Sequence, residues 1–379
     1  MIYLDYAATT PMSEEAIEVY TRVSRSVFGN PSSLHDAGSH AFHLLEHCRE
    51  ELAELLHAHK TGIYFTGGGS ESNILALQSL IEASTIDKGH LITTKVEHPS
   101  ILNFFARLEG HGYDVTYLSV DKEGLIDLQE LSAAIQDNTI LASIHHGNGE
   151  IGTLQKMEEI GDILHSRNIL FHSDCVQTFC KVPMNVNLLP VDSLSFSSHK
   201  VYGPKGVGAV YISPETPWQP YLPNTTHEKG FRSGTVNVPG IAAFVTAAQN
   251  LHQEMTEEQT RLSAIRHLFI KELASLPYQI KIEGAVHQKL AHILGMRAEG
   301  VQGQYLMLGC NRHGIAISTG SACSTGQQSP SKTMTAIGRS ETEARQFVRL
   351  SFGKSTTADH VYQTVKTLNA LLEEFFDTK

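Results

Sequence analysis

The stretch that decides the fold is "IYFTGGGSESN", Ile63–Asn73. Four strand-forming residues, Ile63–Thr66, are followed at once by three glycines and then by the start of a helical pattern. A glycine-rich turn that opens a helix presents backbone N–H groups and the positive end of the helix dipole, which suits a phosphate. The alternative is a tight strand-to-helix turn that needs a positive φ at one glycine. The pattern is neither GxGxxG nor GxxxxGKS/T, so it leaves both interpretations open.

Short strands recur along the first half of the chain, and helix-like segments separate most of them. The predicted strands are Ile63–Thr66, Leu91–Thr94, Val115–Ser119, Ile140–His145, Ile169–Ser173 and Leu194–Ser198. This alternation predicts an α/β fold with a mostly parallel sheet wrapped by helices. Beyond about residue 250 the pattern changes to a long polar helix near Thr256–Leu276, shorter elements, and a final helix near Thr357–Phe376. We therefore expect a large domain at residues 13–250, and a smaller α+β domain made of residues 1–12 and 251–379.

Composition narrows the classes of partner and the cell compartment. The chain has 379 residues and a formal net charge of −11, with no conspicuous run of Lys or Arg, so neither nucleic acid nor an anionic membrane is an expected partner. The N-terminal stretch lacks the features of a secretory signal, and no apolar run is long enough to span a bilayer. The five cysteines form no CxxC pair. We expect no disulfide framework, no metal site and a reducing cytoplasmic location.

The residues that follow the strands are the candidates for chemistry, because ligands of an open parallel sheet bind at the carboxyl ends of its strands. His98 follows the second predicted strand, where a lone histidine is more often a surface or capping residue than a catalyst. Asp174 and Gln177 follow the fifth; a carboxylate there needs a cation, a metal or a protonated ring nitrogen, unless it only caps the next helix. Lys200 follows the sixth, where partial desolvation makes an amine nucleophilic, unless the side chain simply reaches solvent.

Together these groups indicate one cofactor. A phosphate cradle, a strand-end aspartate and a strand-end lysine on one sheet edge are what pyridoxal phosphate (PLP) requires: an anion cup, an acid for the pyridine nitrogen and an amine for covalent attachment. Zinc would need several His or Cys ligands at close spacing. His145 and His146 cannot readily supply them, because adjacent strand residues face opposite sides.

A second unusual stretch is "STGSACSTG", Ser318–Gly326, in which one cysteine stands among small residues. A structural cysteine is normally buried among apolar side chains, and a loop of Ser, Thr and Gly cannot bury it well. Such a loop is expected to be mobile. The stretch therefore predicts an exposed thiol on a mobile loop, which a structural cysteine would not need.

Ten ordered motifs, spread over nearly the whole chain, carry one family resemblance. They are "YLDYAATTP" (Tyr3–Pro11), "FGNPSSLH" (Phe28–His35), "FTGGGSESN" (Phe65–Asn73), "VEHPS" (Val96–Ser100), "NGEIGT" (Asn148–Thr153), "HSDCVQ" (His172–Gln177), "SSHKVYGPKGVG" (Ser197–Gly208), "FRSGTVNVPG" (Phe231–Gly240), "STGSACS" (Ser318–Ser324) and "VRLSFG" (Val348–Gly353). With these motifs the chain resembles the cysteine desulfurases of the NifS/IscS type, within the class V aminotransferase group of fold-type I PLP enzymes. The resemblance implies a large PLP-binding domain with a mostly parallel sheet of the seven-stranded type and a smaller α+β domain.

The resemblance also implies the reaction and its partners. L-cysteine would be converted to L-alanine, and the sulfur would pass to an enzyme cysteine as a persulfide and then to an acceptor protein. An iron–sulfur scaffold, a tRNA-thiolation enzyme and a thiamine-pathway protein are the candidate acceptors. A homodimer is implied as well, because in this family a threonine of the partner subunit completes the phosphate cup.

The resemblance assigns a role to each matching residue. Lys200 would form the Schiff base, and His98 would stack on the ring and exchange protons with the substrate. Cys323 would be the nucleophile that takes the sulfur. The other cofactor contacts would be Asp174 at the pyridine nitrogen, Gln177 at the phenolic oxygen, Gly69, Ser70, Ser197 and His199 at the phosphate, and Thr235 at the phosphate bound by the partner.

Arg349 matches the arginine that grips the substrate carboxylate, and its own strand supports this role. Val348, Leu350 and Phe352 are expected to share one strand face, which puts Arg349 on the other. A guanidinium binds a carboxylate in a bidentate manner. The alternative is an ordinary surface arginine.

Other functions are compatible with the same fold. A class V aminotransferase has no use for a loop thiol such as Cys323, whereas selenocysteine as substrate stays open. A non-catalytic sulfur carrier or scaffold is disfavoured by the presence of Lys200, Asp174 and His98. The chain also departs from the family at Gly149, where relatives commonly carry an asparagine near the ring oxygen, although Asn148 stands just before it.

Overall fold

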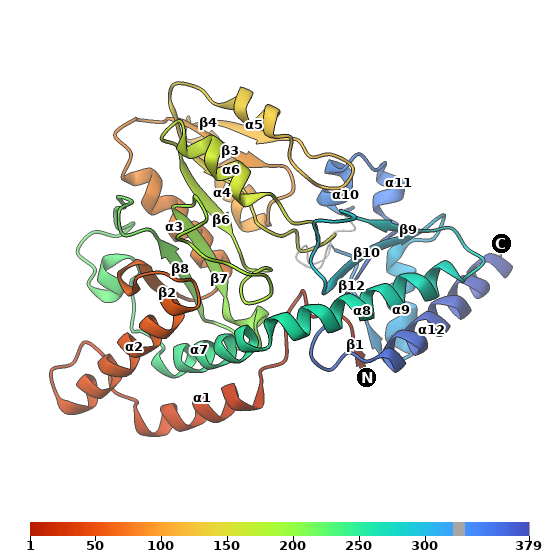
Figure 1. The fold of residues 1–379 in the computed structure, drawn as a ribbon, viewed down its shortest axis with the longest axis horizontal. Coiled ribbons are helices and arrows are strands. Elements are labelled where there is room, and N and C mark those ends of the chain that lie inside the picture. The colour runs from red at the N-terminus through yellow and green to blue at the C-terminus, as the bar shows by residue number, and fades with distance from the viewer. Residues whose placement is uncertain (321–329, 379) are drawn as a thin grey trace.

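The computed structural model describes residues 1–320 and 330–378. Its centre is a seven-stranded sheet in the order β2-β8-β7-β6-β5-β3-β4 (Figure 1). In chain order the strands are β2 (Ile63–Thr66), β3 (His90–Thr94), β4 (Asp114–Leu118), β5 (Thr139–Ser143), β6 (Leu170–Asp174), β7 (Ser193–Ser197) and β8 (Gly208–Ile212). All six predicted strands are present, and their ends differ from the predicted ones by at most two residues. The predicted α/β class and the mostly parallel sheet are confirmed.

One strand of the sheet was not predicted. β8 runs antiparallel to both of its neighbours, β2 and β7, while the other neighbouring pairs are parallel. Its five residues, "GAVYI", are fully buried and lie only eight residues after Lys200. A connection this short cannot carry a crossover helix, so the chain turns back antiparallel. Because β2 and β7 are both antiparallel to β8, they run in the same direction and end at the same sheet edge.

Helices cover both faces of this sheet. The helices of the described chain are α1 (Glu14–Ser26), α2 (Asp36–Glu54), α3 (Gly69–Glu82), α4 (Pro99–Gly110), α5 (Leu128–Ala134), α6 (Met157–His165), α7 (Val238–Gln253), α8 (Met255–Ala274), α9 (Gly303–Arg312), α10 (Lys332–Ala336), α11 (Glu341–Ala344) and α12 (Ala358–Asp377). Adjacent strand residues face opposite layers: Leu141 packs in an apolar cluster with α3 and α4, whereas Ala142 packs with α2, α6 and α7. The helices expected near Thr256–Leu276 and Thr357–Phe376 are confirmed as α8 and α12.

A second, antiparallel sheet lies beside α8, which follows α7 across the molecule (Figure 1). It consists of β9 (Ile280–Glu283), β10 (Ile293–Ala298) and β12 (Phe347–Ser351), and it shares an apolar cluster with α8, α9 and α12. The N-terminal strand β1 (Ile2–Tyr3) pairs with β11 (Ile315–Ala316) beside it. The division into domains at residues 12 and 250 stays a prediction.

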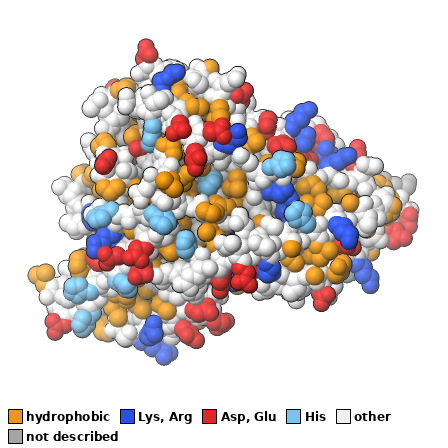
Figure 2. All heavy atoms as spheres, in the orientation of Figure 1, with side chains coloured by type: hydrophobic (Ala, Val, Ile, Leu, Met, Phe, Trp, Pro, Cys, Tyr) orange, Lys and Arg blue, Asp and Glu red, His pale blue; other side chains and the backbone are white. Residues whose placement is uncertain are grey.

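Charges of both signs are mixed over the described surface that Figure 2 shows, and blue Lys and Arg side chains form no continuous field there. Of the helices that the structure describes, none is long and apolar enough to cross a bilayer.

Candidate active site

The predicted lysine stands where the sheet meets the N-terminal segment. Lys200 ends the short 3₁₀ turn η2 (Ser198–Lys200), which follows β7 directly. Its Nζ donates to the carbonyl oxygens of Ala7 and Ala8, the latter at 2.7 Å. Thr10 fixes this segment, because its backbone N–H donates to the His199 carbonyl at 2.9 Å. The amine is therefore held at the carboxyl end of a central strand, as predicted from the sequence.

Asp174 is the last residue of β6, the strand beside β7, and it is buried. Asn73 Nδ2 donates to its Oδ2 at 2.8 Å, and the backbone N–H of Val176 donates to its Oδ1 at 2.9 Å. Both oxygens of the carboxylate thus accept a hydrogen bond from an N–H group, which suits the ionised form in a buried position. The helix-cap alternative describes only the Val176 contact and leaves Asn73 unexplained.

Gln177 reaches the same carbonyl as Lys200. Its Nε2 donates to Ala7 O at 3.0 Å, and its Oε1 is buried with no hydrogen-bond partner among the described residues. Gly149 faces this amide: a Cβ at Gly149 would lie 3.2 Å from Gln177 Nε2. The glycine that replaces the family asparagine therefore lies against Gln177. The predicted donation from Gln177 to the cofactor oxygen stays a prediction, and the second hydrogen of the Gln177 amide can make it while the first stays on Ala7.

His98 is the N-cap of α4, and its side chain is exposed. Its Nδ1 accepts from the Ser100 backbone N–H at 3.2 Å and lies 2.8 Å from Ser100 Oγ. Ser100 Oγ in turn lies 3.1 Å from Asn73 Nδ2, which also binds Asp174. The capping role and the candidate catalytic position therefore coincide in one residue.

The predicted phosphate site brings together the start of α3 and the end of β7. Gly69 begins this 14-residue helix, and a Cβ on Gly69 would lie 3.2 Å from Ser197 Cβ. Ser70 is exposed in the first turn, and Ser197 Oγ is buried with no partner among the described residues. His199 Nδ1 lies 3.1 Å from Thr9 Oγ1; burial, with smaller contributions from nearby lysines, lowers the pKa of His199 to about 4. Helix N–H groups and an unpaired hydroxyl at one place suit an anion.

Thr235, the residue expected to serve the partner's site, is exposed in the segment before α7. This segment is tied to the start of α3, because Arg232 Nε donates to Glu71 Oε2 at 2.8 Å. Glu71 Oε2 also accepts from the backbone N–H of Gly67. Thr235 therefore lies on a surface segment that Arg232 holds beside the predicted phosphate site of its own chain.

Arg349 lies on β12 and is buried. Val348, Leu350 and Phe352 pack together in the apolar cluster of the smaller sheet, so the predicted alternation is confirmed. Arg349 Nη1 donates to Gly149 O at 2.9 Å, and Nη2 pairs with Asp5 Oδ1 at 2.7 Å. The surface-arginine alternative is wrong. A carboxylate that takes a bidentate hold on Arg349 has to compete with Asp5.

Cys323 lies outside the described residues, but the residues on either side of its segment converge on one carboxylate. Glu150 accepts from Ser331 Oγ at 2.5 Å and from Thr333 Oγ1 at 2.9 Å. At the other end, a Cβ on Gly320 would lie 2.6 Å from Glu150 Oε2. Burial raises the pKa of Glu150, and the two hydroxyl donors oppose that rise. Glu150 comes directly after Gly149, whose carbonyl binds Arg349. Two consecutive residues therefore contact both the candidate site and the residues on either side of the Cys323 segment.

The sequence interpretation missed the polar groups that join the predicted residues. Asn73 lies in the motif Phe65–Asn73, Ser100 in Val96–Ser100 and Asp5 in Tyr3–Pro11, but none of the three was predicted as a site residue. The signal in the sequence was the position of Asn73 and Ser100, an amide and a hydroxyl near the N-terminal ends of two helices that follow buried strands. Which strand-end group each of them meets depends on how α3 and α4 pack against the sheet.

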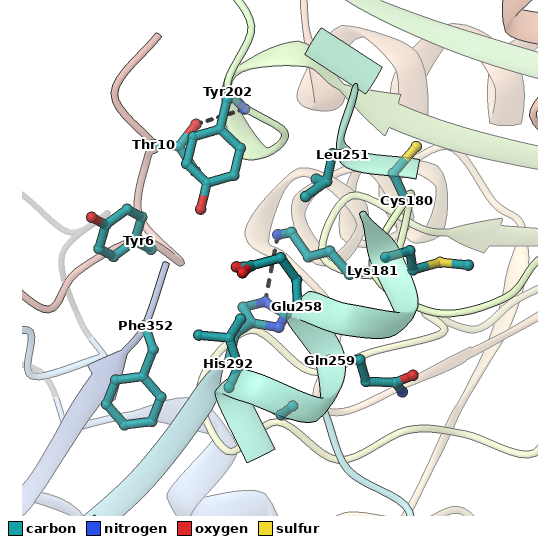
Figure 3. A pocket seen from close by; sticks show the side chains of 13 residues that line it. Tyr6, Thr10, Cys180, Lys181, Tyr202, Leu251, Glu258, Gln259, His292 and Phe352 are labelled. Atoms are coloured by element: carbon teal, nitrogen blue, oxygen red, sulfur yellow. Dashed lines mark hydrogen bonds between the residues drawn. The ribbon is translucent and has the colours of Figure 1, made fainter. Parts of the chain in front are cut away.

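A small cavity of about 40 Å³ lies near this site, where the N-terminal segment meets the end of α7 and the start of α8 (Figure 3). Lys181 points to His292 across it, with 3.4 Å between Lys181 Nζ and His292 Nε2. Burial, and then repulsion from Lys200, lowers the pKa of Lys181 to about 7. Burial, together with Lys181 and Arg349, lowers the pKa of His292 well below its usual range. Glu258, the acid that lines the cavity, is already paired with Arg261 through both oxygens.

We expect Lys181→Met to change how stability depends on pH. Between about pH 7 and 10.5 the unfolded chain keeps the Lys181 proton that the folded chain releases, so stability of the wild type rises with pH there. The variant lacks this rise. From the low to the high end of the window, the free energy of unfolding of the wild type should therefore increase by about 2 kcal/mol relative to that of the variant, after a discount for the partial exposure of Lys181. Urea unfolding at both ends of the window measures this difference. Curves that stay parallel would show that Lys181 keeps its ordinary pKa.

Comparison with known proteins assigns the chain to a family. A family described as "Aminotransferase class-V" matches residues 2–363, which is nearly the whole chain. The chain belongs to the class V aminotransferase family. The predicted resemblance is therefore confirmed.

Among relatives, this class V aminotransferase is most informatively compared with cysteine desulfurases. It is 50% identical over 376 residues to a Bacillus subtilis (strain 168) protein named as a cysteine desulfurase NifS, covering 99% of this chain and 95% of the relative. It is 38% identical over 373 residues to "Cysteine desulfurase IscS" of Dictyoglomus turgidum, covering 98% and 95%. A solved NifS-like protein superposes with a TM-score of 0.92 at 31% identity, covering 98% and 99%. The solved "SspA in complex with cysteine" gives 0.82 at 36%, covering 93% and 99%.

Class V aminotransferases of this kind depend on PLP, and the residues of the site fit that cofactor. Two buried polar atoms have no partner in the described chain: Ser197 Oγ at the end of β7 and Gln177 Oε1 in the segment just after β6. Asp174 offers a carboxyl group whose two oxygens each accept an N–H hydrogen bond at the end of β6, and Lys200 offers a primary amine just after β7. The site therefore contains an acid for a ring nitrogen, an amine for an aldehyde and a cup for a phosphate.

Proposed function

We propose that this chain is a PLP-dependent cysteine desulfurase, which converts L-cysteine to L-alanine and passes the sulfur through Cys323 to an acceptor. One observation carries the proposal: Lys200 and Gln177 both bind Ala7 O, next to the buried Asp174–Asn73 pair, at one sheet edge. The relatives named as cysteine desulfurases, and the neighbour solved with cysteine, support this choice of substrate.

In this proposal the cofactor is held at three points. Asp174 binds its pyridine nitrogen, Lys200 binds it covalently, and Gly69, Ser70, Ser197 and His199 receive its phosphate. His199 is suited to donate a hydrogen bond to the phosphate as an uncharged imidazole, because its pKa is lowered to about 4. When bound, PLP supplies an electron sink for the substrate Cα.

The substrate is oriented and worked on by residues of this chain. Arg349 exchanges Asp5 for the substrate carboxylate, and Lys200 removes the proton from Cα. The Cys323 thiolate attacks the substrate sulfur, a new S–S bond forms, and the C–S bond breaks with its electron pair left on the carbon. That carbon takes up a proton, Lys200 returns a proton to Cα, and the product leaves as alanine. An acceptor thiolate then takes the terminal sulfur from the Cys323 persulfide by thiol exchange.

The partners follow from the same proposal. We place this chain in a homodimer, with Thr235 at the phosphate of the partner subunit, and in the reducing cytoplasm, where Cys323 stays a thiol. The acceptor is an iron–sulfur scaffold, a tRNA-thiolation enzyme or a thiamine-pathway protein. The exposed position of Thr235 beside the Arg232–Glu71 pair supports the shared site.

The experiment that tests the function measures all products of L-cysteine. Purified protein with PLP, L-cysteine and dithiothreitol should release alanine and sulfide in equal amounts. Sulfide accompanied by pyruvate and ammonia would instead show an elimination reaction. Amino-group transfer to a keto acid without sulfide would show an aminotransferase. Alanine formed only from selenocysteine would show a selenocysteine lyase.

A further inference from the structure

Four side chains from three elements form a continuous line of hydrogen bonds through the site. His98 Nδ1 lies 2.8 Å from Ser100 Oγ, Ser100 Oγ lies 3.1 Å from Asn73 Nδ2, and Asn73 Nδ2 lies 2.8 Å from Asp174 Oδ2. Asn73 is 1% exposed and Asp174 8% exposed, so the inner half of the line is shielded from water. The line joins the residue expected at the cofactor nitrogen to the histidine expected on the cofactor face.

The direction of the inner bonds is fixed by Asp174. An ionised carboxylate only accepts hydrogen bonds, so Asn73 has to turn its NH₂ group towards it. The other oxygen of Asp174 already accepts from the Val176 backbone N–H at 2.9 Å. The second hydrogen of the Asn73 amide is then directed to Ser100 Oγ, and Asn73 Oδ1 faces His172 Nε2 at 3.4 Å.

The direction of the outer bonds is fixed by a backbone amide. The Ser100 N–H lies 3.2 Å from His98 Nδ1 and can only donate, so Nδ1 carries no hydrogen. Ser100 Oγ accepts from Asn73 and therefore gives its own hydrogen to Nδ1 as well. Neutral imidazole has one N–H group, which these donors place on Nε2.

We infer that Ser100 is a positioning residue, which joins His98 to the Asn73–Asp174 pair and holds the neutral imidazole with its proton on Nε2. This inference rests on the proposed function for its consequence. A ring fixed in this form donates through Nε2 and cannot accept a proton there. Removal of the Cα proton is then the task of Lys200, and His98 serves as a hydrogen-bond donor through Nε2 rather than as a base.

Substitutions at residue 100 separate this role from helix capping. Ser100→Ala keeps the backbone N–H that caps α4, but it removes the hydroxyl and leaves a buried N–H of Asn73 unpaired. Ser100→Thr keeps both groups. Ser166→Ala is the matched control, because Ser166 is exposed and its hydroxyl, among the described residues, donates to the Ile163 carbonyl of its own helix.

The test reads the histidine protons directly. Holoenzyme labelled with ¹⁵N-histidine is studied by NMR of the imidazole nitrogens at neutral pH, and His98 is assigned by the signals lost in His98→Asn. The wild type, Ser100→Thr and Ser166→Ala should show a proton-free Nδ1 and a protonated Nε2. In Ser100→Ala both signals should shift towards the average of the two tautomers.

Kinetics give a second readout. The kcat of Ser100→Ala with L-cysteine should fall about three- to tenfold at unchanged KM, and Ser100→Thr should restore it. A wild-type His98 with its proton on Nδ1, or Ser100→Ala signals identical to those of the wild type, would overturn the inference. An enzyme with the expected tautomer that does not desulfurate cysteine would instead overturn the proposed function alone.

Discussion

Lys200→Ala should yield a colourless protein that does not retain PLP covalently, and its rate of alanine formation should fall about 10³-fold or more. Lys200 is held by Ala7 and Ala8 at the end of β7, beside β6, which ends at Asp174. Lys181 is not expected to take its place, because its amine faces His292. The absorption spectrum measures the loss of colour. Borohydride reduction followed by peptide mass spectrometry locates the cofactor on the wild-type chain.

Lys205→Ala is the matched control, since Lys205 is exposed in the same segment. It should keep the absorption band and a rate within about twofold of the wild type, as expected for a surface position. A Lys200→Ala protein that still carries reduced cofactor on another lysine would contradict the assignment of the Schiff base.

Cys323→Ser should abolish persulfide formation and lower alanine production from L-cysteine about 10³-fold or more, while the PLP absorption band is unchanged. A hydroxyl is too weak a nucleophile to take sulfur from the substrate. The other four cysteines are buried and cannot substitute for it. Burial raises the pKa of Cys48, Cys175 and Cys310 to about 12, and that of Cys180 further, so these thiols stay protonated at neutral pH.

Cys310→Ala provides the control for this variant, because Cys310 lies in the core of the smaller sheet, away from the site. It should desulfurate cysteine at the wild-type rate. Brief treatment of the wild type with iodoacetamide should modify Cys323 selectively and block the reaction. Undiminished alanine formation by Cys323→Ser would remove the thiol from the mechanism.

Much of the fold followed from local patterns. Each predicted strand is a short apolar run between turn residues. The two long helices of the C-terminal part, α8 and α12, lie where the helical periodicity of the sequence predicted them. β8 was not predicted; it begins at the last glycine of the motif Ser197–Gly208, without a helical segment between it and β7. Its antiparallel direction depends on pairing with β2, which is about 145 residues earlier in the chain.

The site was predicted in a similar way, residue by residue but without its connections. Lys200 and Asp174 stand at strand ends, and strand order alone brings them together. The Asp5–Arg349 pair joins residues 344 positions apart, and the Asn73–Asp174 bond spans 101. Such contacts depend on tertiary packing, which no local pattern records. The sequence could therefore name the chemical groups but not the proton positions that the hydrogen bonds impose on them.

The central claim, that this chain moves sulfur from cysteine to its own Cys323, is tested most directly by single-turnover mass spectrometry. Holoenzyme is mixed with less than one equivalent of L-cysteine that carries heavy sulfur, without reductant, and is then alkylated and digested. We expect one heavy sulfur on the Cys323 peptide for each alanine released. Alanine formed while the Cys323 peptide stays unlabelled, or heavy sulfide released together with pyruvate and ammonia, would contradict the account.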